Sequence, residues 1–146
     1  MKYFLIITAL LLTACTSKIT LNQTASINEI MQIIALAEEK APEGIEGSFT
    51  MDIQSTGRHG DIFLNTQLDY RDRRNLTVTI DEKTGKKLAA IYGSPPEVYF
   101  LNKKVNVDGS AYRAKIWLYI NEKQTEEYYY QTRIYVTSPN QIEIIE

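Results

Sequence analysis

Short runs of alternating apolar and polar residues recur from residue 47 onward, and they restrict the fold more than any other feature of the chain. The runs with this period of two are 49–54, 75–80, 112–120 and 128–136. Such alternation is typical of half-buried β-strands. Turn-forming residues separate the runs at about 8–12 residues, the spacing of a small barrel or sandwich. The sequence therefore predicts a mainly β domain of five or six strands.

The segments between these runs are less regular. Residues 81–87 are polar and charged, which predicts a solvated turn, and residues 88–92 are a short apolar piece of undefined type. Residues 97–101 lie between two prolines and a polar turn, and we expect them to form a strand.

An amphipathic helix is predicted before the β domain, over residues 26–42. Ser26 and Glu29 fit a capping box, in which each side chain satisfies a backbone N–H of the first turn. Apolar residues follow at helical spacing, and Pro42 ends the helix because proline cannot continue it. We expect the apolar face to pack on the chain's own domain, with packing on a partner as the alternative.

The first fifteen residues have the layout of an export signal. One lysine precedes an apolar run that is too short for a bilayer, which takes about 20 residues, and small residues follow. The ending Leu12-Thr13-Ala14-Cys15 resembles a bacterial lipobox. The resemblance implies a signal peptide over residues 1–14, an acylated Cys15 as the mature N-terminus, and a polar tether over residues 15–25. An ordinary buried thiol is the alternative for Cys15.

The lipobox resemblance also implies a location. Two or more fatty chains on Cys15 would anchor the protein stably, whereas a single chain binds a membrane only marginally. Thr16 follows the cysteine in place of aspartate, which in a Gram-negative cell resembles the pattern for export to the outer membrane. We therefore expect an exported lipoprotein anchored in the outer membrane and facing the periplasm. The inner membrane is the alternative.

Composition limits the possible partners. Residues 15–146 have the length of one domain, and the single cysteine leaves no pair for a disulfide within the chain. The formal net charge is −2 at pH 7, so the chain lacks the basic footprint of nucleic-acid-binding proteins. We expect the membrane and an envelope protein or glycan as partners, and we do not expect nucleic acid.

Three segments resemble stretches of bacterial oligonucleotide/oligosaccharide-binding (OB) fold domains found in exported and nuclease-associated proteins. They are residues 60–65, residues 69–78, with an Asp-Tyr loop that leads into a strand, and residues 134–142, with a Ser-Pro exit. The resemblance covers roughly residues 44–146. It implies a domain over residues 43–146, a small closed or partly open OB-like barrel of five to six strands preceded by one α-helix. It also implies binding of nucleic acid, sugars or peptides.

Few residues offer catalytic chemistry. His59 is the single histidine and lies in a glycine-flanked turn, and no serine stands in a nucleophile-elbow context. A zinc site would need further ligands, because one histidine and one lipidated cysteine leave only carboxylates. We therefore expect no catalytic residues, no metal and no cofactor, and we interpret His59 as structural or exposed.

A charged loop offers an enzymatic alternative. Its residues are Asp69, Tyr70, Arg71, Asp72, Arg73 and Arg74. Carboxylates around calcium, next to arginines that stabilise phosphoryl charge, would suit an OB-type metal-dependent phosphodiesterase or nuclease. A solvated loop whose charges pair with each other explains the same residues, and we favour that interpretation.

Two predicted strands carry alternating cations and aromatic rings. The candidate binding face consists of Arg113, Lys115, Trp117 and Tyr119 on the first strand and Tyr129, Arg133 and Tyr135 on the second. If the strands pair, we expect these residues to share one sheet face, where bases or sugars would stack at about 1–3 kcal/mol each. Cross-strand packing of cationic stems on the tyrosines is the alternative, and we favour it.

The sequence as a whole predicts a lipid-anchored, non-enzymatic envelope lipoprotein whose OB-like module binds a protein or glycan partner. Two alternatives stay open. One is the metal-dependent phosphodiesterase or nuclease centred on Asp69, Arg71 and Asp72. The other is an immunity or inhibitor lipoprotein that blocks a toxin or a lytic enzyme.

Overall fold

The computed structural model describes residues 27–145, with side chains from residue 29 onward. The expected signal peptide, Cys15 and tether lie outside the described residues, so these expectations stay predictions. Within residues 27–145, no helix combines the length and the apolar character needed to cross a membrane. The strands are β1 (Ile45–Asp52), β2 (Ser55–His59), β3 (Asp61–Asn65), β4 (Leu76–Ile80), β5 (Lys104–Ile120), β6 (Lys123–Val136) and β7 (Ile142–Ile144). The helices are α1 (Ile27–Glu39), α2 (Glu82–Tyr92), α3 (Pro96–Tyr99) and the 3₁₀ turn η1 (Pro139–Gln141).

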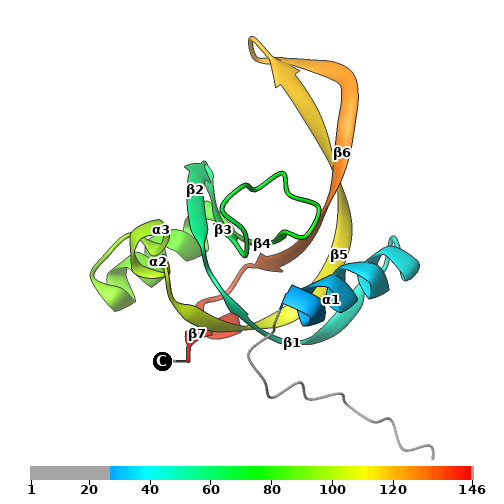
Figure 1. Cartoon of the computed structure of the whole chain (residues 1–146). Coiled ribbons are helices and arrows are strands. Elements are labelled where there is room, and N and C mark those ends of the chain that lie inside the picture. Colours follow the sequence, from blue (N-terminus) through cyan, green and yellow to red (C-terminus); the bar gives the residue numbers. More distant parts are fainter. Residues whose placement is uncertain (1–26, 146) are drawn as a thin grey trace, which may run out of the picture.

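The strands form one curled sheet in the order β1-β5-β6-β4-β3-β2, and β7 pairs with β5. β1 and β2 follow each other directly in the chain, yet β1 pairs with β5 and β2 pairs with β3, at opposite ends of this order. One bent stretch of chain therefore supplies both ends of the sheet and curls it into an open half-barrel (Figure 1). β4 and β6 run parallel, and the other neighbours are antiparallel. The predicted mainly β, OB-like fold, preceded by one helix, is confirmed.

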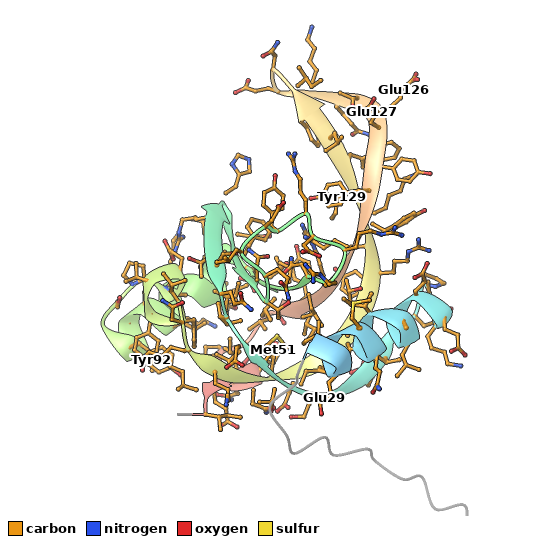
Figure 2. All side chains as sticks on the ribbon, viewed as in Figure 1. Glu29, Met51, Tyr92, Glu126, Glu127 and Tyr129 are labelled. Atoms are coloured by element: carbon orange, nitrogen blue, oxygen red, sulfur yellow. The ribbon has the colours of Figure 1, made fainter. Side chains whose placement is uncertain are left out.

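The core lies inside the curl of the sheet. β4 is central, and all five of its residues are buried, as suits a strand of leucine and β-branched residues. Leu76, Val78 and Ile80 point into the core, whereas Thr77 and Thr79 point to the outer face because side chains alternate along a strand. Figure 2 shows Met51 of β1 within the barrel, where its side chain is fully buried.

Helix α1 packs against the barrel through its apolar face. Ile30, Ile33 and Ala37 are buried, and the helix contacts β5, β1 and β6. Figure 1 shows α1 alongside β5 and β1. The apolar face therefore packs on the chain's own domain, as expected.

The prediction of a turn over residues 81–87 was wrong, because this segment begins helix α2. The Asp81 carboxylate caps the helix: it accepts hydrogen bonds from the Thr84 backbone N–H at 2.9 Å and from the Thr84 hydroxyl at 2.8 Å. Gly93 ends the helix in the left-handed conformation, at φ 71°. Thr84 and Leu88 are buried, so the charged residues that suggested a turn form the solvent face of an amphipathic helix.

The prediction of a strand over residues 97–101 was also wrong. Pro96 starts the short helix α3, where its fixed φ suits a first helical position. The Tyr99 and Phe100 backbone N–H groups then donate to the carbonyl oxygens of Pro95 and Pro96, both at 2.9 Å. The fully buried Phe100 ring follows and packs edge-on against Tyr92 and Tyr99. Phe100 thus enters the core from a helical turn, whereas Val98 and Leu101 are exposed.

Asp81→Ala should destabilise the domain by about 1 kcal/mol, the typical value of an N-cap. The hydrogen bond from the Thr84 backbone N–H is the main reason why the pKa of Asp81 lies below its ordinary value of 3.8. The stabilisation from the charged cap is therefore present above the unfolded pKa and is lost as pH falls through the lower folded pKa.

Urea unfolding at pH 7 measures the loss of stability on removal of the cap, and unfolding at pH 3 measures how much of the stabilisation is lost in acid. Asp81→Asn is the control, because it keeps an acceptor and should remain close to wild type at pH 7 while losing this acid dependence. An unchanged unfolding midpoint for Asp81→Ala at pH 7 would contradict the role of the cap.

Strands β5 and β6 continue beyond the barrel as a two-stranded arm, residues 112–131 (Figure 1). β1 pairs with β5 only up to Ala111, and β4 pairs with β6 only from Thr132. At the tip, Asn121 and Glu122 have φ values of 50° and 64°, as the turn of a tight hairpin requires. Among the described residues, the arm therefore has no third strand over most of its length.

Candidate ligand-binding cleft

A cavity of about 480 Å³ lies between β2, the outer face of the sheet and the base of the arm. We call it the outer cleft. It is lined by Ser55, Thr56, Gly57, Arg58, His59, Phe63, Asn65, Leu68, Tyr70, Thr77, Tyr129, Gln131 and Arg133. Figure 2 shows Tyr129 on the arm, on the side that faces β2. The volume lies within the usual range of small-ligand sites, about 300–1,000 Å³.

Strand register brings the sheet residues of the outer cleft together. Arg133 of β6 lies opposite Thr77 of β4, which in turn lies opposite Asn65 of β3. The next outward-facing positions pair likewise: Thr79 of β4 lies opposite both Tyr135 of β6 and Phe63 of β3. The odd-numbered residues of three strands that are distant in sequence therefore form one outer surface.

A buried polar network fixes the loop over residues 66–75 at the base of the outer cleft. The Asn75 amide nitrogen donates to the Thr77 hydroxyl at 2.9 Å, to the Tyr70 carbonyl oxygen at 3.1 Å and to the Asn65 side-chain oxygen at 3.2 Å. The Asn75 side-chain oxygen accepts from the Gln67 backbone N–H at 3.1 Å. Because buried polar groups that are fully paired hold one geometry, this network positions the loop rigidly.

Three side chains of the outer cleft keep donors for a ligand. Arg133 donates from Nε to the Gln131 side-chain oxygen at 2.9 Å, and its guanidinium carbon lies 5.3 Å from the centre of the Phe63 ring. Within residues 27–145, Arg133 forms no ion pair with a carboxylate, and neither the Tyr129 hydroxyl nor the His59 imidazole has a hydrogen-bond partner. Arg58 differs, because both its Nε and a terminal nitrogen bind Glu97, at 2.7 and 2.8 Å. Arg133 is thus the cation of the cleft that is free to meet an anion.

The tyrosines of the outer face stay protonated well above neutral pH. Burial is the largest cause of the raised pKa of Tyr112, Tyr129 and Tyr135. For Tyr135, the nearby Asp61 raises the pKa further, and the Tyr135 hydroxyl donates to this carboxylate at 3.2 Å. At physiological pH these phenols therefore act as hydrogen-bond donors and apolar surfaces.

The predicted aromatic and cationic set is divided between the two faces of the arm. β5 and β6 pair as expected, but the register places Trp117 opposite Tyr128 and Lys115 opposite Tyr130. Odd-numbered residues of β5 therefore share a face with even-numbered residues of β6. The predicted residues on one face are Arg113, Lys115, Trp117 and Tyr119, and those on the other are Tyr129, Arg133 and Tyr135. The expectation of one shared face was wrong.

The face that carries Trp117 is packed within itself. The Lys115 ammonium lies 3.8 Å from the Tyr128 ring centre and 4.2 Å from the Trp117 ring centre. The Arg113 guanidinium carbon lies 3.7 Å from the Tyr130 ring centre, and Arg113 also pairs with Glu38 of α1 at 3.2 Å. Cations that already cover aromatic rings support the interpretation of cross-strand packing on this face.

The charged loop pairs mainly within itself. Arg74 occupies both carboxylate oxygens of Asp72, at 3.0 and 2.7 Å, and these hydrogen bonds lower the pKa of Asp72 to about 2. Asp69 accepts from the Arg71 backbone N–H, and the Arg71 side chain donates to the Tyr70 hydroxyl. Arg71, Asp72 and Arg73 also line a second, smaller cavity of about 100 Å³ near α1. This pairing supports the interpretation of a solvated loop.

The part of the chain that the structure describes offers few side chains that could ligate a metal ion together. No group of three His, Cys, Asp or Glu side chains there has a geometry that could hold an ion. His59 is exposed at the turn between β2 and β3, on the rim of the outer cleft.

The sequence analysis did not identify three residues of the outer cleft, Phe63, Asn65 and Thr77. Only the strand order shows that they share a surface with Arg133.

Comparisons with known proteins add little to this geometry. No protein-family model and no curated protein matches the chain. Among solved structures, it is similar to a protein provisionally assigned as an aspartyl-tRNA synthetase from Leishmania major Friedlin, with a TM-score of 0.37 and 12% identity. The match covers 93% of this chain but only 23% of that chain. At this level the similarity carries no argument about function.

Proposed function

We propose that the protein is a lipid-anchored envelope lipoprotein whose OB-like barrel binds a glycan that carries an acidic group, without catalysing a reaction. The outer cleft supports this proposal through one observation: a guanidinium without a carboxylate partner among residues 27–145 lies in a cleft of ligand size. A bound carboxylate would form charge-assisted hydrogen bonds with Arg133, which are roughly twice as strong as neutral ones.

The neighbours of Arg133 favour a sugar over a nucleic acid. Sugar rings stack on exposed aromatic surface and bind through hydroxyl groups, for which Tyr129 and His59 keep free polar atoms. The Arg133 guanidinium lies over the Phe63 ring, 5.3 Å from its centre, so a ligand binds here mainly through polar contacts. With a net charge of −2 the chain lacks the basic surface that a phosphate backbone, charged at every nucleotide, requires. A glycan that bears occasional carboxylates suits one isolated cation.

Arg133→Gln should weaken binding of an acidic oligosaccharide by about 10–100-fold, since a hydrogen bond to a charged group contributes about 1.5–3 kcal/mol. Isothermal titration with uronic-acid oligosaccharides, and with neutral oligosaccharides of the same length, measures this loss. The affinity for the acidic series should also fall as salt is added.

Arg74→Gln is the matched control, because Arg74 lines neither cavity and pairs with Asp72. Equal affinity of the wild type and Arg133→Gln for the acidic series would overturn the role of Arg133. If a protein is recovered instead after photocrosslinking at position 129 in intact cells, the cleft serves a protein ligand, as the immunity or inhibitor alternative requires.

The anchor is tested separately from the cleft. Radioactive palmitate should label the wild-type protein and should not label Cys15→Ala, because thioether and amide acylation both require this residue to become the mature N-terminus. The wild type should be recovered with membranes after fractionation. Label in the variant equal to that in the wild type would contradict the lipobox interpretation.

A further inference from the structure

The arm exposes more apolar surface than an isolated hairpin normally tolerates. Two-stranded hairpins are at best marginally stable in water, and a third strand or a packed face is usually needed. Near the tip, Tyr119 and Ile120 are 62% and 64% exposed, and Tyr128 and Tyr130 on β6 are nearly half exposed. Tyr119, Tyr128 and Tyr130 share one face of the arm and Ile120 lies on the other. Exposed large apolar side chains gathered on one element are typical of an interaction site.

The β6 edge of the arm is protected against further pairing. Trp117 pairs with Tyr128 but Tyr119 pairs with Gln124, so the extra residues form a bulge over 125–127 of β6. The Thr125 hydroxyl holds this bulge by donating to the Leu118 carbonyl oxygen at 3.0 Å. Figure 2 shows Glu126 and Glu127 in this part of the arm. Bulges and charges are the usual means of blocking an exposed strand edge.

The β5 edge has no such protection near the tip. β5 runs without interruption over residues 112–120, since the extra residues of the bulge all belong to β6. Within residues 27–145, no strand pairs with the β1 side of β5 beyond Ala111. Helix α1 meets the base of the arm, where Glu38 pairs with Arg113 at 3.2 Å. A regular strand edge is therefore open for pairing.

We propose that this edge of β5 pairs antiparallel with the same edge of a second copy of the chain, with Ile116 on the two-fold axis. An antiparallel pair of identical strands is related by an axis perpendicular to the sheet, so odd-numbered residues of both copies lie on one face. In this register Lys115 lies opposite Trp117 of the second copy, and Arg113 lies opposite its Tyr119.

Charge and hydrophobicity together favour this register and a second copy as the partner. Both cations of residues 112–120 meet an aromatic ring, which repeats the contact that Lys115 already makes with Trp117 at 4.2 Å. A register centred on Lys115 would place two ammonium groups face to face. On the opposite face, Ala114 meets Leu118 and Ile116 meets its own copy. The strand is therefore complementary to itself in both charge and hydrophobicity.

The contact is small, so we expect a dimer that depends on concentration. Residues 112–120 of each copy are fewer than the about 20–30 residues per side of a standard interface. If both copies are anchored in one membrane, as proposed above, their local concentration rises and favours the dimer. The pairing itself does not depend on the anchor or on the outer cleft.

Ile116→Cys tests the register directly in the full-length chain. Directly opposed residues of an antiparallel pair have Cα atoms about 4.5–5.5 Å apart, within the range that a disulfide bridges. Oxidation of the purified variant at high protein concentration should give a species of twice its monomer mass on a non-reducing gel. Leu118→Cys is the control: it is half-buried like Ile116, but it lies opposite Ala114, so it should give little dimer.

A second variant tests association without a new cysteine. Ile116→Lys places two cations at the axis, so it should abolish the chemical crosslinking between lysines that we expect of the wild type at the same concentration. Its circular dichroism spectrum should match that of the wild type, since the β5–β6 pairing is retained. Equal disulfide yield for Ile116→Cys and Leu118→Cys, or equal lysine crosslinking of the wild type and Ile116→Lys, would overturn the proposal.

Discussion

Gly44→Ala should destabilise the folded chain by roughly 3 kcal/mol, through two costs that add. Gly44 has a φ of +77°, where a residue with a Cβ atom loses about 1–2 kcal/mol. The added Cβ would also lie 2.5 Å from the Ala111 carbonyl oxygen and 2.8 Å from the Tyr112 Cβ atom. These atoms are fixed in β5, so strain of about 1–3 kcal/mol follows. Urea unfolding followed by circular dichroism measures the total.

Gly60→Ala is the matched control for this substitution. Gly60 has nearly the same φ, +73°, but an added Cβ there meets no atom within 4 Å. We therefore expect only the conformational cost, about 1–2 kcal/mol. Equal losses in the two variants would show that the close approach of Gly44 to β5 is not a constraint on the barrel.

The strands of the barrel were predictable because burial on one face leaves a period of two in the sequence. The chain over β4, β5 and β6 shows this pattern, and the structure forms strands there. Helix α2 was missed, because its lysines resemble a turn when the buried face consists of only a few residues. Asp81, Thr84 and Gly93 carried the signal for its two ends, since they form the N-cap and the left-handed C-cap.

The candidate site was less predictable than the fold, because it depends on register. The sequence shows which residues alternate along β5 and along β6, but the faces that they share depend on the turn at the tip. This turn has two residues and pairs Ile120 with Lys123, so odd-numbered residues of β5 lie opposite even-numbered residues of β6, and the bulge near Thr125 shifts the register by two without changing the faces. A one-residue slip moves every side chain of one strand to the other face. Arg133 therefore belongs with Phe63 and Thr77 across the sheet, and not with Trp117 on the arm.

Asn75→Ala should cost roughly 2–4 kcal/mol and loosen the loop at the base of the outer cleft. Asn75 is 2% exposed, and its amide joins β3, β4 and the loop through hydrogen bonds to Asn65, Thr77 and Tyr70. The substitution leaves the buried Gln67 N–H without this acceptor, and each unsatisfied buried group costs about 1–3 kcal/mol. Urea unfolding gives the energy, and hydrogen exchange over residues 66–75 reports the loosening.

Two further substitutions test whether the effect of Asn75→Ala comes from its buried hydrogen bonds and not from the loss of an asparagine as such. Asn140→Ala removes an exposed asparagine and should change stability by less than about 0.5 kcal/mol. Asn75→Asp keeps an acceptor but buries a carboxyl, whose folded pKa should be raised by desolvation. Its stability should therefore increase as pH falls from 7 toward 5, opposite in sign to the acid dependence expected for Asp81. If Asn75→Ala unfolds at the same urea concentration as Asn140→Ala, the buried network does not order the loop that shapes the cleft.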